Sequence, residues 1–179
     1  MTRPGYFFSL AVAVSIVLPV RSQNDQAAVE KAIALIKELN GTYEIDETIP
    51  GKPIVKINLN GTKVRNQHLA TFVPLKNLRD LNLGSTLITN SGMQYVKMMT
   101  GLRTLDLQRT AVRDEGLRYL KGLEKLQLLN LDNTEVTDKG LEYLKSLKLL
   151  GNINLRQTKV TDAGIRSLKK ALPELNVLR

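Results

Sequence analysis

The chain has 179 residues, of which 42% are hydrophobic and 24% charged, so its length and composition fit one globular domain with a substantial core. Aromatic residues make up only 4% and tryptophan is absent, which means that the core must be aliphatic. Cysteine is also absent, which excludes a disulfide framework, a thiolate nucleophile and a thiolate metal site. The formal net charge is +9, so the chain is basic.

The first 22 residues have the pattern of a secretory signal peptide. Arg3 precedes an uncharged run over residues 7–18, and Val20 and Ser22 follow at the spacing of a cleavage site. We expect cleavage after Ser22, which would leave 24 Lys and Arg against 17 Asp and Glu, a net charge of +7, in a secreted or periplasmic protein. The run is shorter than the ~20 apolar residues that span a bilayer, so no stable membrane insertion is expected after cleavage. An uncleaved segment that anchors the chain to a membrane is the alternative.

Residues 23–53 are expected to form an N-terminal cap. Residues 25–39 carry apolar side chains at helical spacing, at Ala28, Ala32, Leu35 and Leu39. The pair Asn40-Gly41 would end this helix, and residues 42–45 are typical of a strand. Such a segment would shield the exposed end of the repeats that follow.

Residues 54–179 repeat with a period of 24 residues. Similar segments open at Ile54, Leu78, Leu102, Leu126 and Leu150. A truncated sixth copy is expected to begin at Leu175, after a one-residue insertion. In one unit Leu102, Leu105 and Leu107 alternate as in a strand, and the later apolar residues shift to helical spacing at Val112, Leu117, Leu120 and Leu123. The sequence therefore predicts five strand–helix repeats and a partial sixth.

Neither the strand nor the helix of one unit can bury its apolar side alone, so the units must stack. We expect an α/β solenoid, with a parallel sheet on the inner, concave face and helices on the outer, convex face. Two columns of polar residues fit this arrangement. Threonines follow each strand, where we expect a buried polar ladder, at Thr62, Thr86, Thr110, Thr134 and Thr158. Residue types that cap helices precede each helical segment, at Asn90, Asp114, Asp138 and Asp162, with Thr89, Thr137 and Thr161 before them.

The unit LxxLxLxxTxVTDxGLxxLxxL resembles the leucine-rich-repeat superfamily, and within it the short, 24-residue, cysteine-containing-like class found in exported bacterial proteins. The resemblance covers residues 54–179 and departs from the common pattern by having Thr where many repeats have Asn or Cys. It implies a right-handed αβ superhelix whose usual role is to bind other molecules.

The residues that point outward from the predicted strands form the most site-like feature. One polar residue recurs per strand, at Asn58, Asn82, Asp106, Asn130 and Asn154, and Asp80 and Arg109 lie beside this row. These seven residues are the candidate ligand-binding set. A row of amides about 4.8 Å apart could bind a peptide or a repetitive ligand such as a glycan. Alternatively, neighbouring amides bond to one another and only keep the face soluble.

The function that we expect is a non-catalytic scaffold that binds an extracytoplasmic protein or peptide. The alternative is a lectin-like protein that binds cell-surface polysaccharide or another polyanion, which the net charge favours. The basic residues form no continuous run, and export argues against nucleic acid as a partner. A hydrolase built on Asp114 and Asp138 is a third hypothesis, but helix capping explains these carboxylates. His68 is the only histidine, and we expect no metal and no cofactor.

Overall fold

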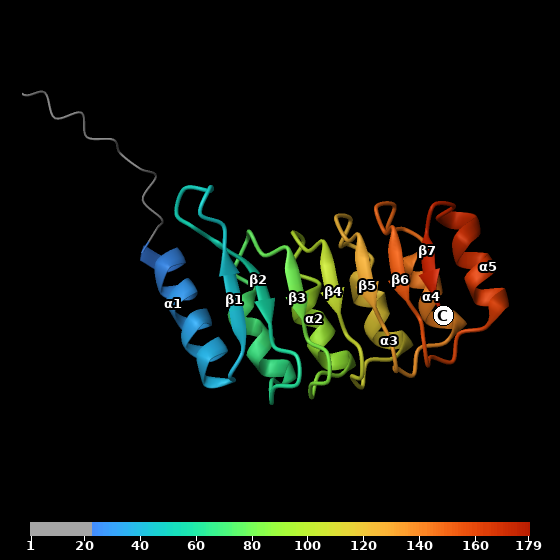
Figure 1. The fold of residues 1–179 in the computed structure, drawn as a ribbon, viewed down its shortest axis with the longest axis horizontal. Coiled ribbons are helices and arrows are strands. Elements are labelled where there is room, and N and C mark those ends of the chain that lie inside the picture. The colour runs from blue at the N-terminus through green and yellow to red at the C-terminus, as the bar shows by residue number, and fades with distance from the viewer. Residues whose placement is uncertain (1–22) are drawn as a thin grey trace, which may run out of the picture.

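Seven strands form one sheet whose spatial order follows the chain, β1-β2-β3-β4-β5-β6-β7. The structure is a computed structural model that describes residues 23–179, so the expected signal segment lies outside the described residues. The strand β1 pairs antiparallel with β2, and the later neighbours pair in parallel. The sheet forms one side of the array and the helices form the other (Figure 1). The predicted α/β solenoid is confirmed.

The strands of the repeats are short because each unit needs only one inward side chain between two outward ones. Their bounds are β1 (Thr42–Ile45), β2 (Ile54–Asn58), β3 (Asp80–Asn82), β4 (Thr104–Asp106), β5 (Leu128–Asn130), β6 (Asn152–Asn154) and β7 (Asn176–Leu178). The central residue of each strand from β3 to β6 is an aliphatic side chain that is at most 1% exposed. Because side chains alternate along a strand, the residues on either side of this central residue point away from the helices, toward the free surface of the sheet.

The helical legs of the repeats are shorter and more mixed than the single helix that we expected. They are η1 (Asn66–Phe72), η2 (Asn90–Gly92), α2 (Met93–Val96), α3 (Asp114–Leu117), η3 (Arg118–Leu120), α4 (Asp138–Leu141), η4 (Glu142–Leu144) and α5 (Asp162–Ala171). A 3-10 helix rises about 2.0 Å per residue against 1.5 Å in an α-helix, so these turns carry the chain toward the next strand in fewer residues. In the described region, no helix is both long enough and apolar enough to cross a bilayer.

The core is a single aliphatic cluster that runs the length of the array. In one repeat, Leu105, Leu107, Val112, Leu117 and Leu120 are all completely buried. Phe72 is the one aromatic side chain among the buried core residues of the described part of the chain. The expectation of an aliphatic core is confirmed.

The helix α1 (Gln23–Glu38) and the strand β1 close the N-terminal end of the core, as predicted. The buried side of α1 is centred on Ala32 and Ile36, which are both completely buried, whereas Leu35 and Leu39 are only partly buried. The predicted helical face is therefore rotated toward Ile36, because this larger side chain fills the end of the core.

The strand β7 keeps the 24-residue period exactly in register with β6. Its pairs are Asn152 with Asn176, Ile153 with Val177, and Asn154 with Leu178. The one-residue insertion expected before Leu175 is therefore wrong. The C-terminal residue helps to hold this end in place, because the Arg179 guanidinium bonds to the Asp162 carboxylate and to the Val160 carbonyl.

Candidate functional site

The outward residues of the strands form two rows, which together we call the sheet face. The first row consists of Lys56, Asp80, Thr104, Leu128 and Asn152, and the second row of Asn58, Asn82, Asp106, Asn130 and Asn154. Register adds Glu44 and Thr42 of β1 at one end and Asn176 and Leu178 of β7 at the other. The structure thus brings six of the seven candidate residues onto one face, and Arg109 lies apart from them.

Each residue of the second row has a structural role at the end of its strand. Its side-chain oxygen accepts a hydrogen bond from the backbone N–H two residues later, at 3.0 Å for Asn58, 2.9 Å for Asn82 and Asp106, and 3.1 Å for Asn130 and Asn154. This is the local turn that Asn and Asp favour. In the described region no bond joins neighbouring amides of this row, so only the second polar atom of each side chain remains for a ligand.

Arg109 belongs to a turn that recurs beyond each strand. Ser85, Arg109, Asn133 and Gln157 occupy the left-handed region with φ between 50° and 53°, and Gly61 takes the same place in the first repeat with φ 71°. The backbone N–H groups of all but Gln157 donate to a carbonyl of the next repeat, as Arg109 does to Asp132 at 2.9 Å. Arg109 therefore lies on the edge of the array, past the end of the sheet face.

The threonine column satisfies backbone groups as expected, and Thr86, Thr110 and Thr134 are buried, although each hydroxyl bonds within its own repeat. The hydroxyls of Thr110 and Thr134 each donate to the carbonyl three residues earlier, on Leu107 and Leu131, at 2.7 Å. These bonds satisfy the carbonyl of the residue directly after each strand, inside the same repeat, where both threonines are buried.

The Asn and Asp column links the repeats instead. The carboxylate of Asp114 accepts from the Thr137 N–H at 2.8 Å and from the Thr137 hydroxyl at 2.7 Å. Asp138 holds Thr161 in the same way at 2.8 Å and 2.6 Å. We call each such pair a clasp. The threonines Thr89, Thr137 and Thr161 are the helix N-caps, and the carboxylates reach across to the next repeat.

The expectation that these carboxylates cap their own helices is wrong, and the clasps give Asp114 and Asp138 a different structural role. Hydrogen bonds from the Thr161 hydroxyl and N–H hold the pKa of Asp138 below its ordinary value. A general acid needs the opposite shift, so the environment of Asp138 does not favour that role. In the described region, no group of three or more His, Asp or Glu side chains is arranged to hold a metal ion. His68 accepts a hydrogen bond from the Arg65 N–H through Nδ1, at 3.2 Å.

The tyrosine column packs on the helix side of the array. Tyr95, Tyr119 and Tyr143 are partly buried against the core. The Arg118 guanidinium lies 4.8 Å from the centre of the Tyr119 ring, and Lys121 Nζ lies 5.2 Å from that of Tyr143. The three rings therefore pack against the core, and Tyr119 and Tyr143 also form cation–π contacts.

The sheet face is hollowed in two places that meet at Leu128 and Asn130. One hollow of about 340 Å³ lies over β2 to β5 and is lined by both rows, including Asp80, Thr104 and Asp106. The second, of about 230 Å³, lies over β5 to β7 and is lined by Leu128, Asn152, Asn154 and Leu178 among others. Together they form a continuous surface across the sheet.

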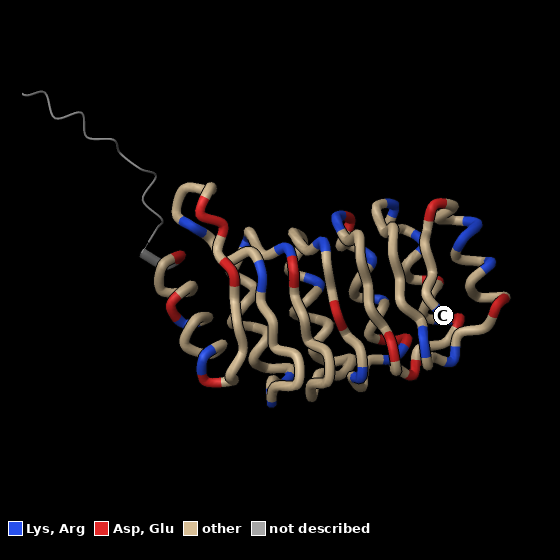
Figure 2. Tube along the Cα trace, viewed as in Figure 1, with Lys and Arg blue, Asp and Glu red and all other residues tan. Residues whose placement is uncertain are grey.

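The charges on the sheet face gather at its N-terminal end. Lys56 donates to Glu44 at 2.8 Å, which raises the pKa of the Lys56 ammonium, and its attraction to Glu44 and then Asp80 adds to this shift. Asp80 and Asp106 form no ion pair within contact distance among the residues described. Figure 2 shows acidic segments on neighbouring strands of the sheet, and the outward residues of β5 and β6 are uncharged.

Strand–helix units stacked along one sheet define the chain as a solenoid repeat protein. A family model described as Leucine Rich repeat matches residues 100–121 and 122–145. Among solved structures, the chain is similar to an internalin from Listeria monocytogenes, with a TM-score of 0.53 and 25% identity over 62% of this chain and 30% of that one. These matches support a relationship of the chain to the leucine-rich-repeat superfamily.

A leucine-rich-repeat protein of Leptospira interrogans also matches, with a TM-score of 0.47 and 22% identity over 60% of this chain and 27% of that one. The chain spans less than a third of the length of either structure. A search of the curated proteins gives no match.

Proposed function

We propose that the protein is a non-catalytic scaffold that binds an extracytoplasmic protein or peptide through its sheet face. Leucine-rich-repeat proteins generally bind other proteins. The shape of the sheet face is the observation that supports this site, because two adjoining hollows lie across the surface of the sheet that points away from the helices. Binding sites are concave surfaces that present a few fixed polar groups, and this surface has both properties.

The extracytoplasmic location rests on the signal-like pattern of residues 1–22. If that segment is removed, the described array is the part of the chain that meets a partner outside the cytoplasm.

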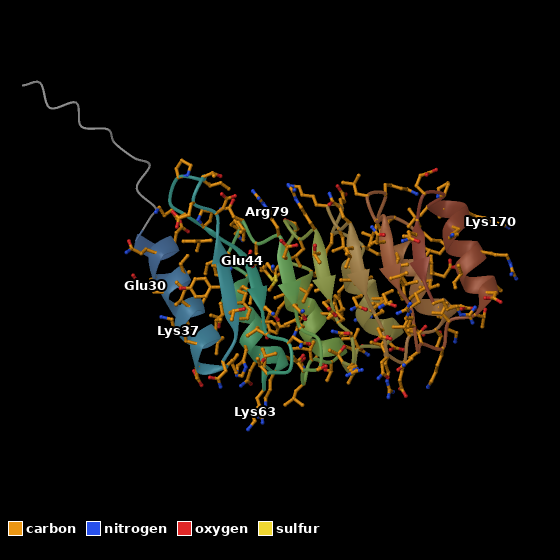
Figure 3. The ribbon with its side chains drawn as sticks, in the orientation of Figure 1. Glu30, Lys37, Glu44, Lys63, Arg79 and Lys170 are labelled. Atoms are coloured by element: carbon orange, nitrogen blue, oxygen red, sulfur yellow. The ribbon has the colours of Figure 1, made fainter. Side chains whose placement is uncertain are left out.

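The charge of the sheet face favours a peptide over a polyanion. Its two rows from β2 to β6 contain one cation, Lys56, and two anions, Asp80 and Asp106, so they sum to −1. Other cations lie away from this face. Lys63 and Arg79 lie beyond opposite ends of the strands, and Lys170 is on α5 (Figure 3). An anionic polysaccharide would meet repulsion on the face that has the hollows.

The test is a selection of random peptides against the chain, repeated with two charge-matched variants. Thr104→Arg with Leu128→Arg places two cations on the sheet face, at side chains that make no hydrogen bond in the structure. Gln94→Arg with Met98→Arg places two cations on exposed positions of the helix side. We expect the first variant to lose the selected peptides and the second to retain them, with folding of both checked by circular dichroism.

Equal loss in both variants, or none in either, would remove the sheet face as the site. Binding of a polysaccharide that the first variant retains and that salt abolishes would support the lectin-like alternative, since exposed charge interactions are screened by salt.

A further inference from the structure

The sheet face has two chemically different ends. The acidic end consists of Asp80 on β3 and Asp106 on β4, neighbouring strands in the parallel sheet. The apolar end consists of Leu128 on β5, which is 40% exposed, and Leu178 on β7, which is 46% exposed. Between these leucines lies β6, whose outward residues are the shorter Asn152 and Asn154, and this produces the smaller hollow.

Among the residues described, the two aspartates form no ion pair and the two leucines stay exposed. Lys56, the nearest cation on the face, is already bonded to Glu44. Asp106 uses one oxygen to accept from the Gln108 N–H at 2.9 Å, and no hydrogen bond to the other oxygen is found in the described region. Leu128 and Leu178 are two of the six large hydrophobic side chains that are exposed among residues 23–179. A ligand that supplied a cation to one end and an apolar side chain to the other would satisfy both.

We propose that the sheet face binds an extended peptide segment in which Lys or Arg lies four residues from a large apolar residue. This inference rests on the proposed function and specifies the partner. The cation would meet Asp80 and Asp106, and the apolar side chain would enter the hollow between Leu128 and Leu178.

The spacing follows from the sheet itself. The acidic end is centred between β3 and β4 and the apolar end over β6, a separation of two and a half strands, or about 12 Å at ~4.8 Å per strand. An extended peptide advances about 3.3 Å per residue, so four residues cover roughly 13 Å. Four is also an even number, so both side chains point to the same side of the peptide. In an α-helix four residues advance only about 6 Å, which is too short.

The probes are fluorescein-labelled nine-residue peptides of Thr and Ser that contain one Lys and one Leu. In the first peptide the two are four residues apart, in the second two and in the third six, and a fourth replaces the Lys of the first by Glu. Affinity for the full chain is measured by fluorescence anisotropy. We expect the first peptide to bind about tenfold more tightly than the others, a difference of the size that one or two well-placed surface contacts provide.

Two variants separate the two ends of the face. Asp80→Asn with Asp106→Asn removes the charge and keeps the oxygen that accepts from Gln108, so the fold is preserved. Its control is Glu124→Gln with Glu174→Gln, two exposed carboxylates away from the sheet face. We expect the aspartate variant to bind the first peptide about threefold to tenfold more weakly than the wild type does, and the control to bind it with unchanged affinity. Leu128→Asn, which copies the residue found at this place on β6, should weaken every Leu peptide about fivefold.

The inference is overturned if the three spacings bind equally, if no peptide binds, or if the aspartate variant retains the affinity for the Lys peptide. If selected peptides bind the sheet face but lack the four-residue spacing, the proposed function stands and this inference fails. If selected peptides survive Thr104→Arg with Leu128→Arg, both fail.

Discussion

Replacing Gly140 by alanine should separate the clasp from the general packing of the repeats. Gly140 lies in α4, directly beside the carboxylate of the previous repeat. A Cβ at this position would lie 2.5 Å from Asp114 Oδ1 and 3.0 Å from Leu117 Cδ1. The carboxylate must therefore move away, and the two hydrogen bonds that it accepts from Thr137 would be lost.

The expected loss in the free energy of unfolding is about 2–3 kcal/mol. Each hydrogen bond to a charged acceptor contributes about 1.5–3 kcal/mol, and the lower end applies here because Asp114 is only partly buried. Alanine recovers about 0.5–1 kcal/mol relative to glycine within a helix, which reduces the loss. Gly122→Ala is the matched control, because no atom lies within 4 Å of its added Cβ and its φ is ordinary. This control should be neutral or stabilising by up to about 1 kcal/mol.

Urea denaturation followed by far-UV circular dichroism measures both variants, since the chain has no tryptophan. The two substitutions should change the free energy of unfolding in opposite directions, or differ by at least about 2 kcal/mol. Equal stability of Gly140→Ala and the wild type would show that the clasp contributes little, and the explanation for a glycine at this position would be wrong.

Three further changes test other features of the array. Asp114→Asn should retain the free energy of unfolding to within about 1 kcal/mol, because the amide of Asn66 already holds Thr89 through both of its polar atoms. Asp114→Ala removes both acceptors and should lose about 2–3 kcal/mol. Denaturation curves of the two variants test this, and equal losses would contradict it. The pKa of Asp138 is lowered in the folded protein, so its contribution to stability is present above the ordinary carboxyl pKa of about 4 and is lost as the pH falls through the lower folded value. Unfolding measured from pH 6 down to pH 2 should therefore show a steeper acid loss for the wild type than for Asp138→Asn, and parallel curves would refute the assignment. Arg109→Gly should stabilise the chain by about 0.5–1 kcal/mol because it relieves the left-handed backbone, whereas Arg109→Val should destabilise it; thermal melts with the opposite order would contradict the turn geometry.

The fold could be predicted from the sequence because burial repeats every 24 residues. The alternation of Leu102, Leu105 and Leu107 identifies the strand, and recurrence of the same pattern requires stacking. The same reasoning predicted the outward row, since each of its members lies between two inward aliphatic residues. The family match and the similarity to solved structures agree with the fold at this level.

The roles of the candidate residues were harder to predict, because side-chain bonding depends on geometry that periodicity does not contain. Asn82 has a local partner two residues later, a preference of Asn that the sequence did signal. The clasp could not be predicted from one repeat, because it joins side chains of two adjacent repeats. Its sequence signal was the recurring mid-helix glycine at Gly92, Gly116, Gly140 and Gly164, which costs stability unless a close contact requires it.

The position of Leu178 depends on one residue of register. With the expected insertion it would lie opposite Ile153 and point into the core, whereas the observed pairing with Asn154 places it on the sheet face. A single-residue shift turns every side chain of a strand to the other side, and three residues of β7 are too few for the hydrophobic pattern to fix this.

The clasps and the corresponding bonds to Asn66 and Asn90 make the array modular, because each joins residues 23 apart and so reaches only the adjacent repeat. Removal of residues 102–125 would bring Asn90 into the same relation to Thr137 that Asn66 has to Thr89. The shortened chain would keep every kind of contact and lose one strand, about 4.8 Å of sheet. Gain or loss of a whole repeat therefore lengthens or shortens the sheet face by one strand at a time and leaves the packing of the core unchanged.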